Sequence, residues 1–191
     1  MEIDDNQLVK DYLNGLEGSF EIIVKRYTRP LYSFVWRLCG NKESSEDIVQ
    51  DTFLKVWKNL KRFDLERNFK VWIYAIARNS TYDFLRKKKL IMFSEMDNTE
   101  DDSTFEENIA DATPLADQLF EEKETSKLID ESIKNLPERY KEVVILRHET
   151  GMTFEDISDT LKEPMNTVKS RYRRAIMKMQ ESLLLNAPKK V

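Results

Sequence analysis

Residues 153–179, TFEDISDTLKEPMNTVKSRYRRAIMKM, decide the fold class of the C-terminal part of this chain. Thr153 and Asp156 have the spacing of a capping box, with Asp in place of the usual Glu or Gln, so we expect a helix to begin there. Residues 163–165, EPM, then supply a short turn without the more usual glycine, and a second helix follows. Two short helices joined by a short turn predict a helix-turn-helix.

The second of these helices is amphipathic. Its apolar face contains Val168, Tyr172, Ala175, Ile176 and Met179. Its opposite face and flanks contain Asn166, Lys169, Ser170, Arg171, Arg173, Arg174 and Lys178. A solvated helix surface usually alternates the signs of its charges, whereas residues 164–180 hold five basic side chains and no acidic one. The second helix of a helix-turn-helix lies in the DNA major groove, so we interpret the cationic face as a DNA-recognition surface.

The composition of the whole chain favours a helical protein in a reducing compartment. Its 191 residues are 40% hydrophobic and 35% charged, with only 4 Gly and 5 Pro, which is few for an all-β fold. A single cysteine, Cys39, excludes an intramolecular disulfide. No apolar run approaches the roughly 20 residues of a membrane span, and the acidic N-terminus does not resemble a signal peptide. We therefore expect an all-α, cytoplasmic protein.

The net charge of −4 hides an uneven distribution along the chain. Residues 1–90 hold 17 Lys or Arg and 13 Asp or Glu, residues 91–112 hold none and 8, and residues 113–191 hold 14 and 14. The acidic segment has no steady helical or strand period, so we interpret it as a flexible linker. We expect Thr113, which precedes a proline, to begin the first helix after it. The sequence thus predicts two small helical domains, residues 1–90 and 113–185, joined by the acidic linker.

The first domain shows apolar residues at helical spacing over residues 20–27, 31–38, 49–60 and 69–84. Each of these stripes predicts one helix. Residues 40–47, GNKESSED, supply a break and a serine N-cap before the third stripe. There is no sustained alternation of the kind that predicts strands.

Residues 55–89 combine cations with aromatic rings, which is the pattern of a binder of single-stranded nucleic acid. This stretch holds 11 basic and 3 acidic residues. Its aromatic side chains are Trp57, Phe63, Phe69, Trp72, Tyr74 and Tyr82. Trp57, Phe69 and Trp72 fall on the apolar stripes, so we expect them in the core. Phe63, Tyr74 and Tyr82 lie off the stripes and are candidates for stacking on bases.

Two stretches of the sequence together resemble a known family. Residues 44–89, SSEDIVQDTFLKVWKNLKRFDLERNFKVWIYAIARNSTYDFLRKKK, resemble region two of bacterial sigma factors of the extracytoplasmic-function (ECF) group, within the sigma-70 family. Residues 136–179, LPERYKEVVILRHETGMTFEDISDTLKEPMNTVKSRYRRAIMKM, resemble region four of the same group. The linker between them is too short for the region-three domain of housekeeping sigma factors. The resemblance implies a protein that binds core RNA polymerase and directs transcription initiation for an alternative, stress or cell-envelope, regulon.

The resemblance implies partners as well as roles. Residues 46–53, EDIVQDTF, resemble the segment that grips the clamp coiled coil of the polymerase β′ subunit. The residues implied for core-polymerase binding are Asp47, Gln50 and Asp51, whereas Phe53 is expected in the core. The β flap of the polymerase, duplex and melted promoter DNA, and an anti-sigma factor are the other partners that the resemblance implies.

Two further matches imply the contacts with promoter DNA. Residues 62–69, RFDLERNF, resemble the specificity loop that captures a flipped base of the minus-ten element, and residues 73–87, IYAIARNSTYDFLRK, resemble the helix beside it. The residues implied for the minus-ten element are Phe63, Asp64, Arg78, Asn79, Tyr82, Arg86 and Lys87. Residues 166–174, NTVKSRYRR, resemble the minus-thirty-five recognition helix. The residues implied there are Asn166, Thr167, Lys169, Ser170, Arg171, Arg173 and Arg174.

The sequence offers no catalytic or metal-binding pattern. It has no Gly-rich phosphate loop and no Ser/His/Asp set, and the lone His148 and Cys39 lack metal-ligand spacing. We therefore expect no cofactor, and no enzyme activity of the chain on its own. Two other hypotheses compete with the sigma-factor interpretation. A stand-alone helix-turn-helix regulator would explain only the C-terminal part, and a module that binds RNA or single-stranded DNA would explain only the N-terminal part.

Overall fold

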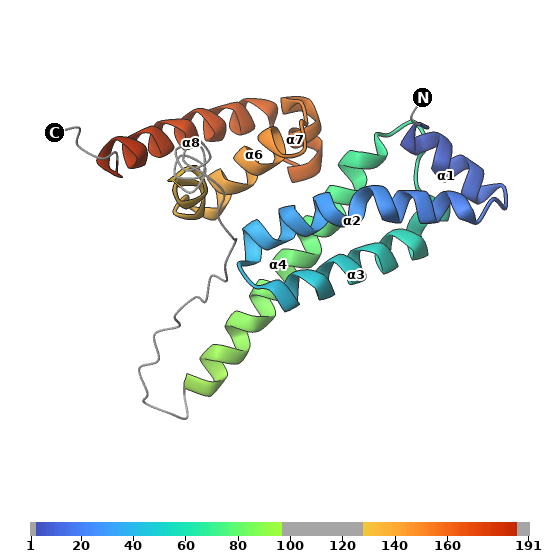
Figure 1. Ribbon diagram of the computed structural model, residues 1–191, viewed down its shortest axis with the longest axis horizontal. Coiled ribbons are helices and arrows are strands. Elements are labelled where there is room, and N and C mark those ends of the chain that lie inside the picture. The colour runs from blue at the N-terminus through green and yellow to red at the C-terminus, as the bar shows by residue number, and fades with distance from the viewer. Residues whose placement is uncertain (1–2, 97–127, 187–191) are drawn as a thin grey trace, which may run out of the picture.

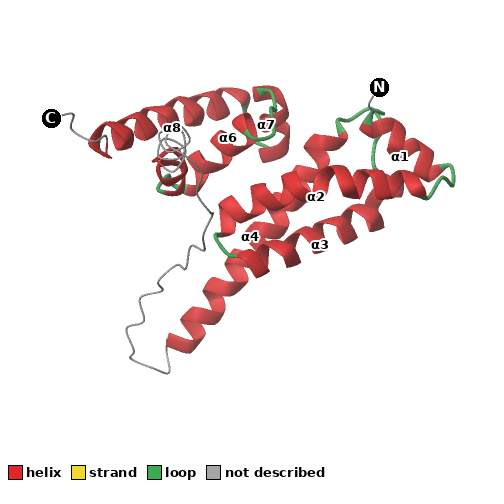
Figure 2. Cartoon of the chain, in the orientation of Figure 1, coloured by secondary structure: helices red, strands yellow, loops and turns green. Residues whose placement is uncertain are grey.

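The computed structural model describes residues 3–96 and 128–186, and within these ranges every regular element is a helix (Figure 2). The helices before the gap are α1 (Asp5–Leu13), α2 (Gly18–Cys39), α3 (Lys42–Asn59), the short 3-10 helix η1 (Leu60–Arg62) and α4 (Phe69–Met96). After it come a helical stretch at residues 128–134 and then α6 (Glu138–His148), α7 (Phe154–Leu161) and α8 (Met165–Asn186). The all-α prediction is confirmed.

The break between α2 and α3 follows from two residues with special backbone roles. Gly40 adopts the left-handed conformation (φ 70°) that ends α2, which glycine tolerates without steric cost. Asn41 is the N-cap of α3, because its Oδ1 accepts a hydrogen bond from the Ser44 backbone N at 2.9 Å. The predicted serine N-cap is therefore wrong. Ser44 and Ser45 lie inside the first turn of α3, three and four positions after the residue that caps it.

The first group of helices packs around one apolar core. Helices α2, α3 and α4 lie against one another, and α1 crosses one end of them (Figure 1). Large side chains with no exposed surface, such as Phe34, Phe69 and Ile73, fill the space between these helices. The expected core position of Phe69 is confirmed.

Two of the aromatic assignments made from helical spacing are wrong. Trp57 was expected in the core, yet it is 52% exposed, and its indole N–H donates to the Tyr12 hydroxyl at 2.8 Å. Tyr74 was expected at the surface, yet it is 1% exposed and packs edge-on against Phe34, with ring centroids 5.2 Å apart. Burial raises the pKa of the Tyr74 phenol, since the phenolate would lose its hydration.

The second group of helices contains the predicted helix-turn-helix, α7 and α8. The capping box is confirmed, with both of its reciprocal bonds between Thr153 and Asp156 present. The turn does not need glycine, because Lys162 takes the left-handed conformation (φ 55°) and Pro164 leads into α8. Val168 and Ala175 on the apolar face of α8 are fully buried, as the spacing predicted.

The helical boundaries differ from the expected domain limits at one point. Helix α4 continues to Met96, so residues 91–96 are helical although their sequence shows no steady helical period. The rest of the acidic segment and the helix expected at Thr113 lie outside the described residues. The division into domains at residues 91–112 stays a prediction.

The two groups of helices share one apolar core. Helix α6 lies against α2, and α7 lies against α4 (Figure 1). A single cluster of buried side chains runs from Phe34 and Ile73 in the first group to Val143, Leu146 and Ile157 in the second. Residues of α4 and α7, far apart in the chain, therefore lie close together in this core.

Candidate nucleic-acid and partner interfaces

The outer face of α3 carries the residues expected to bind polymerase. Asp47 and Gln50 are exposed and Asp51 is half-buried, whereas the neighbouring Ile48 and Val49 are in the core. Because successive helical residues turn by about 100°, this alternation places the polar side chains on the side of α3 that faces away from the core.

Two large apolar side chains extend this face and were not predicted from the sequence. Leu54 is 54% exposed and follows Gln50 and Asp51 by one helical turn, and Trp57 follows one turn later. Asp51 is held by Lys55, with 2.6 Å between carboxylate oxygen and Nζ. Exposed apolar side chains beside carboxylates suit a partner protein that offers apolar and cationic groups. The sequence did contain a signal for them, because the apolar residues of α3 cover more of the helix surface than one packed face would.

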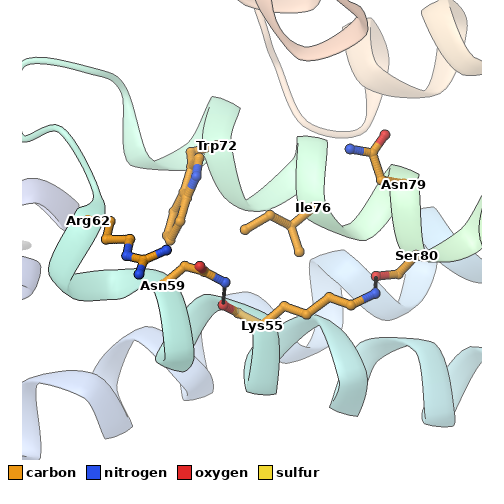
Figure 3. A pocket seen from close by; sticks show the side chains of 7 residues that line it. All are labelled: Lys55, Asn59, Arg62, Trp72, Ile76, Asn79 and Ser80. Atoms are coloured by element: carbon orange, nitrogen blue, oxygen red, sulfur yellow. Dashed lines mark hydrogen bonds between the residues drawn. The ribbon is translucent and has the colours of Figure 1, made fainter.

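A hollow between α3, η1 and the first half of α4 combines cations, amides and an aromatic ring (Figure 3). Its volume is about 500 Å³, and it is lined by Lys55, Asn59, Arg62, Trp72, Ile76, Asn79 and Ser80. Lys55 Nζ donates to the Ser80 hydroxyl at 2.8 Å, which fixes the ammonium group at the floor of the hollow. Binders of single-stranded DNA combine cations that contact phosphates with rings on which bases stack. Amides can in addition hydrogen-bond the edge of an unpaired base. Of the expected minus-ten residues, only Asn79 lines this hollow.

Phe63 does not have the position that its predicted role requires. Its side chain is 8% exposed, and its ring packs against Phe69 and Trp72, with centroids 5.6 and 4.7 Å away. The expectation that Phe63 presents an open stacking surface is therefore corrected: the ring is part of the core. The half-buried Trp72, which Phe63 supports from behind, is the aromatic group that reaches the hollow.

The other expected minus-ten residues divide between two places. Asp64, Arg86 and Lys87 are exposed, and Arg86 forms an ion pair with Asp83 at 2.9 Å. Arg78 and Tyr82 instead lie where α4 meets α6. The Arg78 guanidinium stacks on the Tyr82 ring, 4.9 Å from its centroid.

Glu142 of α6 is the partner of both side chains. Arg78 Nε donates to Glu142 Oε1 at 2.5 Å, and Tyr82 also hydrogen-bonds this carboxylate. Burial raises the pKa of Glu142, although Arg78 counteracts this by stabilising the charged form. Arg78 and Tyr82 are half-buried, so any contact with nucleic acid would compete with their bonds to Glu142.

Most of the expected minus-thirty-five residues share the exposed face of α8. Asn166, Lys169, Ser170, Arg173 and Arg174 are exposed, and Thr167 is half-buried. Arg171 departs from the expectation, because it is half-buried and paired with Glu163 of the turn at 2.9 Å. Arg174 reaches back over α6, where its hydrogen bond lowers the pKa of the Tyr140 phenol. Lys169 and Arg173 are therefore the cations best placed to approach a duplex.

The part of the chain that the structure describes also bears on metal binding and on membrane insertion. No three or more His, Cys, Asp or Glu side chains gather there in an arrangement that could hold a metal ion. No helix in that part is long and apolar enough to cross a membrane.

Comparisons with known proteins agree on one family. The model of Sigma-70 region 2 matches residues 23–91, and the model of Sigma-70, region 4 matches residues 126–179. The ECF RNA polymerase sigma factor SigW of Bacillus subtilis is 31% identical over 185 residues, which cover 96% of this chain and 98% of that protein. The ECF RNA polymerase sigma-E factor of Haemophilus influenzae is 29% identical over 91% of this chain and 92% of its own length.

Solved structures show the same fold. The sigma factor RpoE of Bartonella quintana, in complex with the anti-sigma factor NepR, superposes with a TM-score of 0.68 at 26% identity, over 87% of this chain and 98% of that one. CnrH, in complex with the cytosolic domain of CnrY, superposes with a TM-score of 0.70 at 21% identity, over 96% of this chain and 99% of that one. With both regions matched in order and a relative aligned over nearly its whole length, the chain belongs to the ECF group of the sigma-70 family of RNA polymerase sigma factors.

Proposed function

We propose that the three surfaces described above divide the work of this sigma factor among them. The protein is an alternative sigma factor that directs transcription initiation. The outer face of α3 binds core polymerase, the hollow beside Trp72 holds melted promoter DNA, and α8 reads the minus-thirty-five element as duplex. The observation that supports this most is that one chain carries two separate surfaces with groups suited to DNA. The hollow has the groups that suit a single strand, and α8 has those that suit a duplex.

The physical logic of this division requires no catalytic group. Moving a base out of the stack costs a few kcal/mol, and contacts in a complementary pocket can offset that cost. Core polymerase would hold the two DNA-binding surfaces at promoter spacing. We accordingly propose that the chain works by binding alone, in the bacterial cytoplasm where polymerase and chromosome are found. Its further partner would be an anti-sigma protein, as the RpoE relative has in its solved complex.

Transcription in vitro with core polymerase on a promoter library tests this proposal. We expect specific transcripts only when core enzyme and this protein are both present, from promoters that share a minus-ten and a minus-thirty-five motif. A stand-alone helix-turn-helix regulator would bind its DNA without core enzyme and would not start transcription. The regulon would follow from the selected promoters.

The hollow gives a prediction for single-stranded DNA. Arg62→Ala should weaken binding of holoenzyme to a single strand and lower the salt dependence by about 0.7 in log–log slope, because one phosphate contact is lost. Asn79→Ala should leave that slope unchanged and reduce the preference among bases, because an amide reads base edges. Fluorescence anisotropy across a salt series measures both effects. Lys25→Ala, which removes an exposed cation from α2, is the matched control. Equal slopes for Arg62→Ala and the control would contradict the assignment of Arg62.

The recognition helix gives a prediction for duplex DNA. Lys169→Ala and Arg173→Ala should each reduce the log–log salt slope of duplex binding by about 0.9, which is the effect of one lost phosphate contact. Gel shifts with the minus-thirty-five duplex at several salt concentrations measure this slope. Lys10→Ala, an exposed cation of α1, serves as the control. Arg171→Ala should behave differently and lower the melting temperature, because Arg171 holds Glu163 in the turn.

A further inference from the structure

The loop between η1 and α4, residues 63–68, is held by contacts that its resemblance to a specificity loop does not explain. Within the loop, Asp64 closes a tight turn: its carbonyl accepts from the Arg67 backbone N at 3.0 Å, and its Oδ1 accepts from the Glu66 backbone N at 3.1 Å. Residues 64–68 are exposed, whereas Phe63 and Phe69 at the two ends are buried. The loop therefore presents its side chains to solvent from two fixed ends.

The side-chain amide of one residue in α1, Asn6, holds the middle of this loop. Asn6 Nδ2 donates to the backbone carbonyls of Leu65 and Arg67, at 2.8 Å each. Asn6 Oδ1 accepts from the backbone N of Phe69 at 3.2 Å. Both amide hydrogens of Asn6 and one lone pair of its oxygen are thus used on one loop. These three bonds span 59 to 63 positions of sequence, so they join the loop to a different element.

The position of Asn6 itself is fixed by the helix that carries it. Asp4 caps α1 by accepting from the backbone N of Asn6 at 3.1 Å. Leu8 and Val9, which follow on the same helix, are fully buried in the core. A side chain on a helix anchored in this way holds its partners more precisely than a loop can hold itself.

We infer that Asn6 is a positioning residue for minus-ten recognition, which sets the loop of residues 63–68 at the distance from the hollow at which it can read a base. Asn6 does not touch DNA in this role. It acts through the two loop carbonyls, because they fix where the exposed side chain of Asp64 and the loop backbone meet the captured nucleotide. A binding site tolerates displacements of only about 0.5 Å, so a loosened loop would lose base discrimination before it lost affinity for phosphates. The inference rests on the proposed function of the hollow, which Arg62 lines directly before this loop, and on the resemblance of residues 62–69 to a specificity loop.

Two substitutions separate the carbonyl contacts from the rest. Asn6→Asp keeps an acceptor for the Phe69 N–H but removes both donors and places a carboxylate beside two carbonyl oxygens. Asn6→Ala removes all three bonds. Gln7→Ala is the matched control, because Gln7 is the next residue of α1 and its side chain bonds only to Asp11 of the same helix among the interactions seen, at 2.7 Å.

The measurement uses holoenzyme and pairs of single-stranded oligonucleotides. One strand carries the minus-ten sequence selected in the promoter library, and its partner differs at one base. A single mismatched base costs about 1–3 kcal/mol in specific complexes, which corresponds to roughly 5- to 150-fold in affinity. We expect Asn6→Asp and Asn6→Ala to abolish most of this ratio at one position, while affinity for the mismatched strand and for core polymerase stays unchanged. Gln7→Ala should keep the wild-type ratio.

Hydrogen exchange of the loop amides gives a second readout that does not depend on DNA. Both Asn6 variants should exchange the amides of residues 64–68 faster than wild type. Faster exchange with a wild-type base ratio would overturn the inference and leave the proposed function intact, because Asn6 would then be purely structural. A wild-type holoenzyme that shows no base discrimination on these strands would overturn the proposed function of the hollow, and this inference with it.

Discussion

Phe63→Ala is expected to lower the free energy of unfolding by about 3–5 kcal/mol, the usual cost of removing a buried aromatic ring from a core. The ring contacts Phe69 and Trp72 and is 8% exposed, so its removal leaves a cavity between η1 and α4. Urea or thermal denaturation of the free protein measures the effect. Phe63→Leu should recover most of the stability, because leucine fills much of the same volume.

The same variant distinguishes a core residue from a base-stacking one. If Phe63 acts through the core, promoter opening by Phe63→Ala should fall only as far as the folded fraction falls, and lower temperature should restore it. Normal stability combined with a loss of opening would show instead that the ring leaves the core to stack on DNA. Asp64→Ala, in the adjacent exposed position, is the comparison: it should impair opening through the loop while the core stays packed.

Asp47→Arg is expected to reduce affinity for core polymerase by about 2–5 kcal/mol, or roughly 30-fold or more, which is the cost of removing one partner of a desolvated charge pair. Asp47 is exposed on α3, next to the exposed Glu46, so its reversal should leave the fold unchanged. A titration of labelled core polymerase measures the affinity, and circular dichroism confirms the fold.

The control for this prediction is Glu21→Arg, which makes the same charge change at an exposed position of α2. Equal losses for both variants would mean that polymerase senses only net charge. Unchanged binding by folded Asp47→Arg would remove the α3 face from the proposed interface. Leu54→Ala should weaken binding by a separate route, since it removes apolar surface and leaves the charges in place.

Local sequence signals predicted well the features that depend on neighbours in the chain. The capping box of Thr153 and Asp156, the amphipathic face of α8 and the polar side of α3 each rest on spacings of three or four residues. The prediction of a serine N-cap was wrong although it also rests on neighbouring residues. Helix α3 begins at Lys42, so the residue before it, Asn41, is the cap.

The signals failed where contacts with other helices decide the environment. Trp57 belongs to an apolar stripe, but the core of the first group of helices uses only part of that stripe, and Trp57 stays exposed. Tyr74 is buried although it lies off the apolar stripe, because α4 is covered from more than one side, by α2 and α7. Periodicity identifies apolar faces, but it does not count how many neighbours a helix has.

Pairings across long sequence distances were beyond prediction for a different reason. The sequence predicts Arg78 to be one of the cations of a nucleic-acid surface. No residue near it in the sequence indicates its ion pair with Glu142, 64 positions away. Asn6 likewise carries no local signal for its bonds to the loop. Such contacts exist only once the helices have packed, so a single sequence does not reveal them.

The apolar core that runs through both groups of helices has a consequence for synthesis on the ribosome. Phe34 and Ile73 are made early, whereas Val143 and Ile157, which belong to the same cluster, follow only after residues 97–142 have been added. At about 5–20 residues per second, extension from the end of α4 to the end of α7 takes about 3–13 s. During that interval the emerging chain displays an uncovered apolar surface. We therefore expect a nascent chain of this design to need chaperones at the ribosome exit, and its yield in cells should depend on them.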